Sequence, residues 1–115
     1  MTIAYIIERW PISGGIETVT AALSNELVKR GHQVHILYAI RQECEPMPYQ
    51  IDSRIKEKKF CSIEYSKANI TTIAEYLLDN KVDILINQSN RSADPNLCYE
   101  VKKAVRCQTY HLLAL

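Results

Sequence analysis

The segment IAYIIERWPISGGIETVTAALSNELVKRGHQVHILY, residues 3–38, has the pattern of a strand, a helix and a second strand. Residues 3–7 form a continuous apolar run rich in β-branched side chains, which is typical of a strand covered on both faces. Residues 33–38, which follow a short turn, predict the second strand. The helix between them ends at Lys29-Arg30-Gly31 and presents one apolar stripe, Ile16, Val19, Leu23, Leu27 and Val28. We therefore expect two parallel strands joined by a right-handed crossover, with the first strand central.

The rest of the chain continues the alternation of strand and helix. Residues 39–53 contain Pro46 and Pro48 and predict a loop, and the charged residues 54–61 predict an edge strand of undetermined direction. A second helix is expected from Asn69 to about Asp79, before a buried strand at residues 82–86. Its predicted apolar face consists of Ile70, Ile73, Ala74, Leu77 and Leu78. A third helix should begin at Asp94-Pro95, with Leu97, Val101, Ala104 and Val105 inward, before a last strand near 107–112. Together these elements predict an α/β domain with an open, mostly parallel sheet of about five strands and helices on both faces.

Length and composition exclude several classes of protein. The chain has 115 residues, enough for one domain, which we expect to span residues 1–115. Hydrophobic residues make up 47% and charged residues 23%, as in soluble globular domains. The net charge of +1 provides no overall attraction to nucleic acid, so no nucleic-acid partner is expected. Locally, Lys56, Lys58, Lys59 and Lys67 with Arg54 form a basic cluster that suits either phospholipid headgroups or a solvated sheet edge.

The four cysteines, Cys44, Cys61, Cys98 and Cys107, form no CxxC pair, so no metal site and no cofactor are expected. The apolar run at the amino terminus is too short for a secretory signal, and no stretch approaches the roughly 18 apolar residues of a membrane span. We therefore expect a cytoplasmic protein whose reduced cysteines mostly fill the core.

The loop after the first strand is the first candidate site, because ligands of open α/β sheets bind beyond the carboxyl ends of the strands. Ser13-Gly14-Gly15 immediately precedes a helix, where absent side chains let a ligand reach backbone N–H groups. The same glycines also suit a tight turn without any ligand. Neither GxGxxG nor GxxxxGKS is present, which argues against dinucleotide binding and P-loop chemistry.

Further candidates lie at the same edge of the predicted sheet. Glu17 can contact a ligand or simply stabilise the first turn of its helix. Asn87, Gln88 and Ser89 follow a buried strand and suit a hydroxyl-rich ligand or a solvated loop. His111 ends the last strand, where an imidazole can transfer a proton, bind a sugar or serve a structural role.

Other side chains fit structural roles better. His32 and His35 belong to the start of the second strand, on the opposite edge of the sheet from the candidate site. Trp10 and Tyr5 suit either packing or coverage of the first loop.

Two segments together resemble the start of glycosyltransferase family 4 enzymes, which have the GT-B fold. They are Pro11-Ile12-Ser13-Gly14-Gly15-Ile16-Glu17 and Asn25-Glu26-Leu27-Val28-Lys29-Arg30-Gly31-His32-Gln33-Val34. The resemblance implies a Rossmann-like, acceptor-side amino-terminal lobe of a retaining hexosyltransferase that uses a nucleotide-sugar donor and a glycan or lipid-linked acceptor, as in polysaccharide biosynthesis. It places Gly14 and Gly15 near donor phosphates or acceptor, and makes His111 the counterpart of a catalytic histidine near the donor sugar. The Leu112-Leu113-Ala114-Leu115 sequence departs from the polar stretch that tends to follow that histidine.

The donor-binding, carboxy-terminal lobe of such an enzyme is not in these residues, so we expect an inactive fragment that is prone to self-association and contacts the membrane peripherally. Two alternatives are a flavodoxin-like or regulator-type domain and a nucleotide- or sugar-binding module without turnover. A regulator-type domain needs an acidic pair at the end of the first strand, whereas Glu8 stands without an acidic neighbour. A flavin-binding domain needs a phosphate loop rich in Ser and Thr, whereas Ser13 is the single hydroxyl before Gly14 in the loop.

Overall fold

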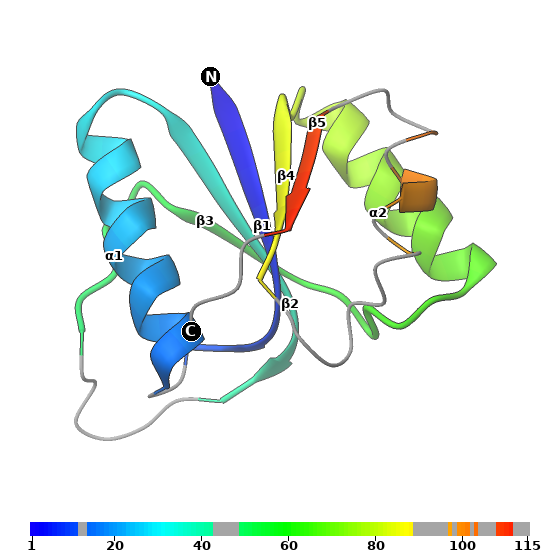
Figure 1. Ribbon diagram of the computed structural model, residues 1–115, viewed down its shortest axis with the longest axis horizontal. Helices are drawn as coiled ribbons and strands as arrows, with labels where there is room; N and C mark the ends of the chain where they lie inside the picture. The colour runs from blue at the N-terminus through cyan, green and yellow to red at the C-terminus, as the bar shows by residue number, and fades with distance from the viewer. Residues whose placement is uncertain are drawn as a thin grey trace.

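Five parallel strands form one sheet in the computed structural model (Figure 1). The structure describes residues 1–11, 14–42, 49–88, 97, 99–101 and 103, and the backbone of 108–111. The strands lie in the order β3 (Lys56–Lys59), β2 (Gln33–Arg41), β1 (Thr2–Trp10), β4 (Ile84–Asn87) and β5 (Gln108–His111). The parallel α/β sheet and its central first strand are therefore confirmed, and the charged strand lies at an edge, parallel to β2.

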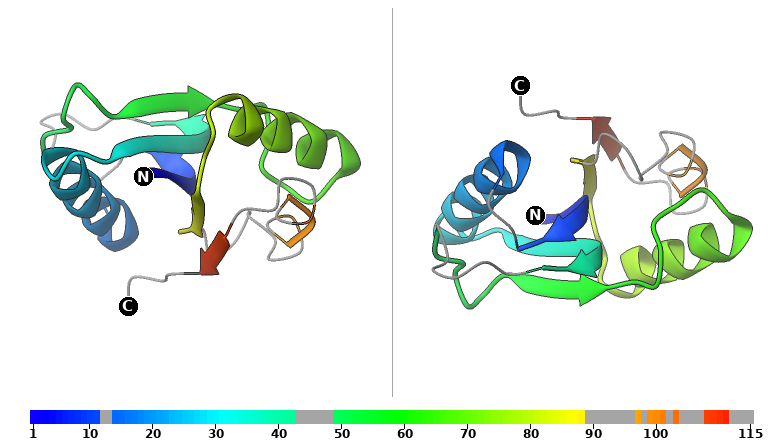
Figure 2. Two further views of the ribbon diagram at one scale, coloured as in Figure 1. Left: turned by 90° about the horizontal axis from the view of Figure 1, so that it is seen from above. Right: turned by 90° about the horizontal axis from the view of Figure 1, so that it is seen from below.

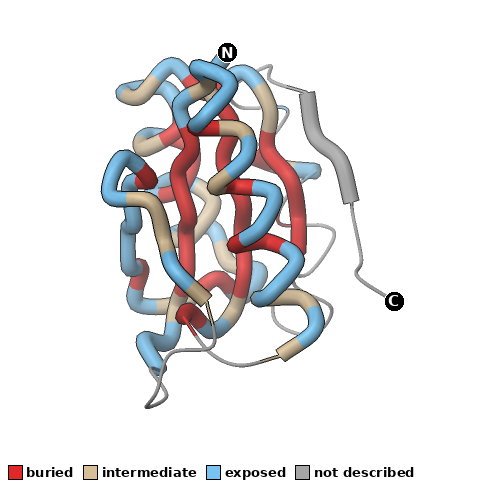
Figure 3. The backbone as a smooth tube through the Cα atoms, turned by 90° about the vertical axis from the view of Figure 1, so that its left-hand side faces the viewer, coloured by how far each residue is buried: buried red, intermediate tan, exposed pale blue. Residues whose placement is uncertain are grey.

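The helices α1 (Gly15–Lys29) and α2 (Lys67–Asp79) cover opposite faces of the sheet, as Figure 2 shows from above and below. In β1, Ile3, Tyr5 and Ile7 belong to the core cluster on the α1 side. Ala4 and Ile6 belong to the cluster on the α2 side. Both sets are buried because each face carries a helix, and Figure 3 shows the inner strands β1, β2 and β4 buried along most of their length.

The buried face of α1 differs from the predicted stripe. Thr20, Ala21, Ser24 and Val28 are buried, whereas the side chains of Val19 and Leu23 are 41% and 42% exposed. The sheet contributes large residues on this side, including Trp10, Tyr5 and Tyr38. Small residues on α1 leave room for these rings, so the helix turns its smaller side chains toward the sheet.

The backbone geometry after α1 and after α2 agrees with the predicted carboxyl ends of both helices. Gly31 adopts φ 92°, a left-handed conformation that favours glycine, just after α1. Lys81 occupies the same region, at φ 53°, after α2. At its start, α2 begins at Lys67 rather than Asn69, because the Ser66 hydroxyl accepts a hydrogen bond from the Asn69 N–H at 3.1 Å and caps the helix.

Three further details differ from expectation or fall outside the described residues. β1 and β2 extend to Trp10 and Arg41, because their ends pair with each other. Leu78 is 55% exposed, although the rest of the predicted α2 face is buried or half-buried. Cys61 is exposed rather than in the core. Several residues with roles predicted from the sequence lie outside the described residues: Ser13, Cys44, Pro46, Pro48, Asp94, Pro95, Cys98, Ala104, Val105 and Cys107.

Leu97 and Val101 are helical and buried in the core on the α2 side, as the pattern of a third helix predicts. Both contribute apolar surface to the same cluster as α2. This face of the sheet therefore receives side chains from two helical regions.

Candidate functional site

The strand order reverses between β1 and β4. From β1 the chain first builds outward through β2 to β3, and it then returns to add β4 and β5 on the other side. In open parallel sheets this reversal leaves a crevice beyond the carboxyl ends of the two inner strands. α1 begins after β1, and Gln88 directly follows β4, so both segments lie at the carboxyl ends of these two strands.

The backbone conformation at the start of α1 does not require the glycine pair. Gly14 has φ 175° and ψ 164°, an extended conformation that any residue adopts. A Cβ placed on Gly15 would meet no atom within 4 Å, and Gly15 itself is exposed. The tight-turn interpretation therefore loses its support. Gly15 leaves the first turn of α1 free of a side chain, and the helix has no side-chain cap at Gly14.

Glu17 lies against Gly14. A Cβ on Gly14 would be 2.6 Å from the Glu17 Oε2 atom, the mobile end of that side chain. The carboxylate thus occupies the space beside Gly14, at the positive end of the helix dipole, where it stabilises α1 by roughly 0.3–1 kcal/mol. A ligand that reached Gly14 would meet this carboxylate.

Asn87 and Gln88 are buried, at 3% and 1% exposure, so the solvated-loop interpretation is wrong for both. The Gln88 backbone N–H donates to the Ile6 carbonyl at 2.8 Å, and its side-chain amide donates to the Thr20 hydroxyl at 3.2 Å. These bonds tie α1 to the sheet at the reversal point. The Gln88 Oε1 atom is buried without a hydrogen-bond partner in the described part of the chain. Ser89 lies outside the described residues.

His111 ends β5, and its Cα is the register partner of Asn87 at the end of β4. The backbone therefore places His111 at the same edge of the sheet as Gln88 and the start of α1. Only its backbone is described. Of the predicted site residues, Gly14, Gly15, Glu17, Asn87, Gln88 and His111 all lie at this edge, which we call the carboxyl rim.

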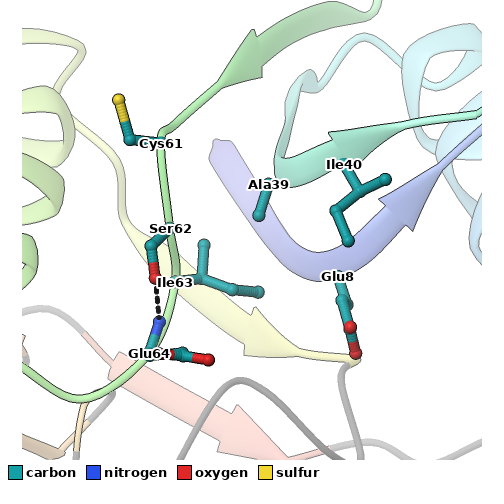
Figure 4. A pocket seen from close by; sticks show the side chains of 7 residues that line it. All are labelled: Glu8, Ala39, Ile40, Cys61, Ser62, Ile63 and Glu64. Atoms are coloured by element: carbon teal, nitrogen blue, oxygen red, sulfur yellow. Dashed lines mark hydrogen bonds between the residues drawn. The ribbon is translucent and has the colours of Figure 1, made fainter.

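Sequence reasoning missed a small pocket of about 140 Å³ at the carboxyl rim (Figure 4). It is lined by Glu8, Ala39, Ile40, Cys61, Ser62, Ile63 and Glu64. Glu8 comes from β1, and Ser62 and Glu64 from the segment after β3, where the Ser62 hydroxyl accepts a hydrogen bond from the Glu64 N–H at 3.1 Å. Two carboxylates above an apolar floor can accept hydrogen bonds from hydroxyl groups.

Tyr5, Trp10 and His35 have buried positions in the sheet. Tyr5 and Trp10 are buried in the core on the α1 side. His35 is buried in β2, away from the carboxyl rim, and its Nδ1 lies 2.8 Å from the Tyr76 hydroxyl. Among the described residues there is no cluster of His, Cys, Asp or Glu suited to a metal, and no helix there is long and apolar enough to span a membrane.

The family comparison agrees with this geometry. The family model described as Glycosyltransferase Family 4 matches residues 13–114. The chain belongs to glycosyltransferase family 4. A comparison with curated proteins finds no match. The region that identifies this family 4 domain contains the glycine pair, Gln88 and His111, so every segment of the carboxyl rim described above except β1 falls inside it.

Proposed function

We propose that this domain is the acceptor-side lobe of a retaining glycosyltransferase of the hexosyltransferase type. The enzyme would transfer a sugar from a nucleotide-sugar donor to a glycan or lipid-linked acceptor, at the cytoplasmic side of a membrane. The open space at Gly15 carries this proposal, because it lies at the start of α1, which has no side-chain cap, beside the reversal of strand order. Helix N–H groups stabilise anions, and a departing nucleoside diphosphate is the anion this reaction produces.

Each part of the carboxyl rim receives a role in this proposal. Gly15 admits the donor phosphates to the start of α1, next to Gly14 and the Glu17 carboxylate. His111, at the end of β5, is proposed to lie near the donor sugar. The pocket beside Glu8 and Glu64 offers carboxylates to acceptor hydroxyls. Gln88 holds α1 in place through Thr20.

A second, donor-binding lobe would complete the cleft. One lobe supplies one wall, whereas sugar transfer needs donor and acceptor held in attack geometry with water excluded. We therefore propose that residues 1–115 form one domain of a two-lobe enzyme.

The purified 115-residue chain is accordingly expected to fold and to transfer no sugar above background. The measurement is turnover of a panel of nucleotide sugars with glycan and lipid-linked acceptors, with product detected by mass spectrometry. Sugar transfer by this chain alone would contradict the two-lobe proposal.

The glycine content of the chain allows a direct test of ligand binding. The chain contains three glycines, so ¹⁵N-glycine labelling gives an amide spectrum of three signals. Gly14 and Gly15 report on the start of α1, and Gly31, after the other end of the helix, is an internal control. We expect millimolar nucleoside diphosphate to move the signals of Gly14 and Gly15 and to leave that of Gly31 in place.

Two results of the titration would contradict the site. Equal movement of all three signals would indicate a bulk effect of ionic strength. No movement of Gly14 and Gly15 across the titration would show that the start of α1 does not bind the diphosphate in this lobe alone.

A further inference from the structure

The pocket at the carboxyl rim combines aliphatic surface with two carboxylates (Figure 4). Ile63, in the segment after β3, is buried, whereas the side chain of Ile40 in β2 is 42% exposed. Glu8 of β1 is half-buried, and Glu64 is exposed. A ligand in this pocket would therefore meet apolar side chains and negative charge together.

Neither carboxylate of the pocket is paired with a cation of the protein. The seven residues that line the pocket include no Lys, Arg or His. Within the part of the chain that the structure describes, neither Glu8 nor Glu64 forms an ion pair. Arg41, the neighbour of Ile40 in β2, is paired with Glu57 of β3 instead. The pocket therefore has a local excess of negative charge, although the net charge of the whole chain is +1.

A cation would complement this charge, and the residues of the pocket indicate its kind. Magnesium and calcium ions take about six to eight oxygen ligands, whereas this pocket has two carboxylates, and no cluster suited to a metal exists among the described residues. An ammonium group has three N–H donors, and its hydrogen bonds to carboxylates are strengthened by charge. Aliphatic side chains pack against the C–H groups of the molecule that carries it. The pocket therefore suits an organic ammonium ion.

The volume of the pocket limits the size of this ligand. At about 140 Å³, it is much larger than the roughly 10–15 Å³ that one water molecule needs. It is smaller than the roughly 300–1,000 Å³ of sites that enclose a drug-sized molecule. One sugar ring that carries an amine fits between these limits.

We propose that this pocket binds the ammonium group of an amino sugar in the acceptor. This inference rests on the proposed function, because it names the class of acceptor that the lobe would hold. Glu8 and Glu64 accept hydrogen bonds from the ammonium group, and Ile40 contacts the C–H groups of the sugar ring. Glu8 belongs to β1, the strand that precedes α1, so the pocket adjoins the strand that leads to the proposed donor site.

The test is a titration of the ¹⁵N-labelled chain with glucosamine, glucose and N-acetylglucosamine at pH 6.5 and matched ionic strength. The amine of glucosamine is mostly protonated at this pH, as an α-amino group with a pKa near 8 is, whereas the other two sugars are uncharged. We expect millimolar glucosamine to move the amide signals of Ser62 and Glu64. It should bind about tenfold more tightly than either uncharged sugar, because each exposed ion pair contributes up to about fivefold.

Variants of the two carboxylates test their part in this preference. Glu8→Gln and Glu64→Gln should each reduce the affinity for glucosamine about threefold, and together they should make glucosamine and glucose bind equally. The control, Glu26→Gln with Glu75→Gln, removes the same charge from exposed residues of α1 and α2 and should keep the tenfold preference. N-acetylglucosamine removes the charge from the ligand instead, so the test does not depend on the folding of any variant.

Four results would overturn the proposal. If the unaltered chain bound all three sugars equally, charge would play no part, and if the control variant also lost the preference, only net charge would matter. Ethanolamine that bound as tightly as glucosamine would assign the pocket to simple amines. Unmoved signals of Ser62 and Glu64 with every sugar would show that the pocket is not a sugar site. These titrations involve neither sugar transfer nor the start of α1, so failure here is distinct from failure of the proposed function.

Discussion

Gly15→Leu is expected to leave the chain folded and, under the proposed function, to reduce sugar transfer by the proposed two-lobe enzyme on the order of 100-fold. The added side chain enters open space, because a Cβ at Gly15 meets no atom within 4 Å. The free energy of unfolding should therefore change by less than about 0.5 kcal/mol, as for other exposed substitutions. Transfer falls because the side chain separates the diphosphate from the N–H groups of α1, and loss of one such donor typically costs about 10²–10³ in kcat.

The control for this variant is Ala22→Leu, which adds bulk at an exposed position farther along α1. Its transfer rate should match that of the unaltered enzyme. Urea unfolding of the isolated chain separates the two interpretations of the glycine pair. If Gly15→Leu destabilised the chain by more than about 1 kcal/mol, the glycine would be needed for the turn itself, and the ligand interpretation would lose its main support.

Local patterns predicted the parts of the fold that depend on neighbouring residues. The apolar run at residues 3–7 lies in a strand buried on both faces, and the Gly31 stop is left-handed as expected. The rotation of α1 was not predictable in this way. The stripe through Val19 and Leu23 is more apolar, but the stripe through Thr20 and Ser24 fits against the large rings of the sheet. Complementary volume across an interface has no signature in the helix sequence alone.

Local patterns likewise predicted one part of the candidate site and missed another. Asn87, Gln88 and His111 were expected at the carboxyl rim because they follow or end predicted strands, and the backbone places them there. The pocket between Glu8 and Glu64 depends instead on the path of the chain after β3, which brings together residues far apart in the sequence. Likewise, buried Gln88 bonds to Thr20, a contact between the residue after β4 and α1 that no short motif records.

Acidification is expected to destabilise the domain through His35. This side chain is 1% exposed, lies 2.8 Å from the Tyr76 hydroxyl through Nδ1, and has no partner for Nε2 among the described residues. Burial lowers the pKa of His35, and the charge of Lys56 lowers it further. Burial also raises the pKa of Tyr76, so its hydroxyl remains protonated beside the imidazole at neutral pH.

The lowered pKa of His35 determines how the stability of the domain changes with pH. Because the pKa of His35 is lower in the folded state than in the unfolded chain, the unfolded state binds the proton more readily. The stabilising contribution of neutral His35 is complete above the unfolded value near 6.5 and is lost as the pH falls from there toward the folded value. Urea unfolding at pH 8.0, 6.5 and 5.5 should show a decreasing free energy of unfolding across this window.

Two variants and one control test whether the pH dependence comes from His35 and Tyr76. His35→Leu should flatten the pH dependence between these values, whereas His32→Asn should not, because His32 lies outside the contact with Tyr76. Tyr76→Phe leaves the buried Nδ1 unpartnered and should cost about 1–3 kcal/mol at pH 8. If His35→Leu kept the full pH dependence, the titrating group would lie elsewhere. If Tyr76→Phe cost nothing, the hydroxyl would not be satisfying the imidazole, and burial alone would hold His35 neutral.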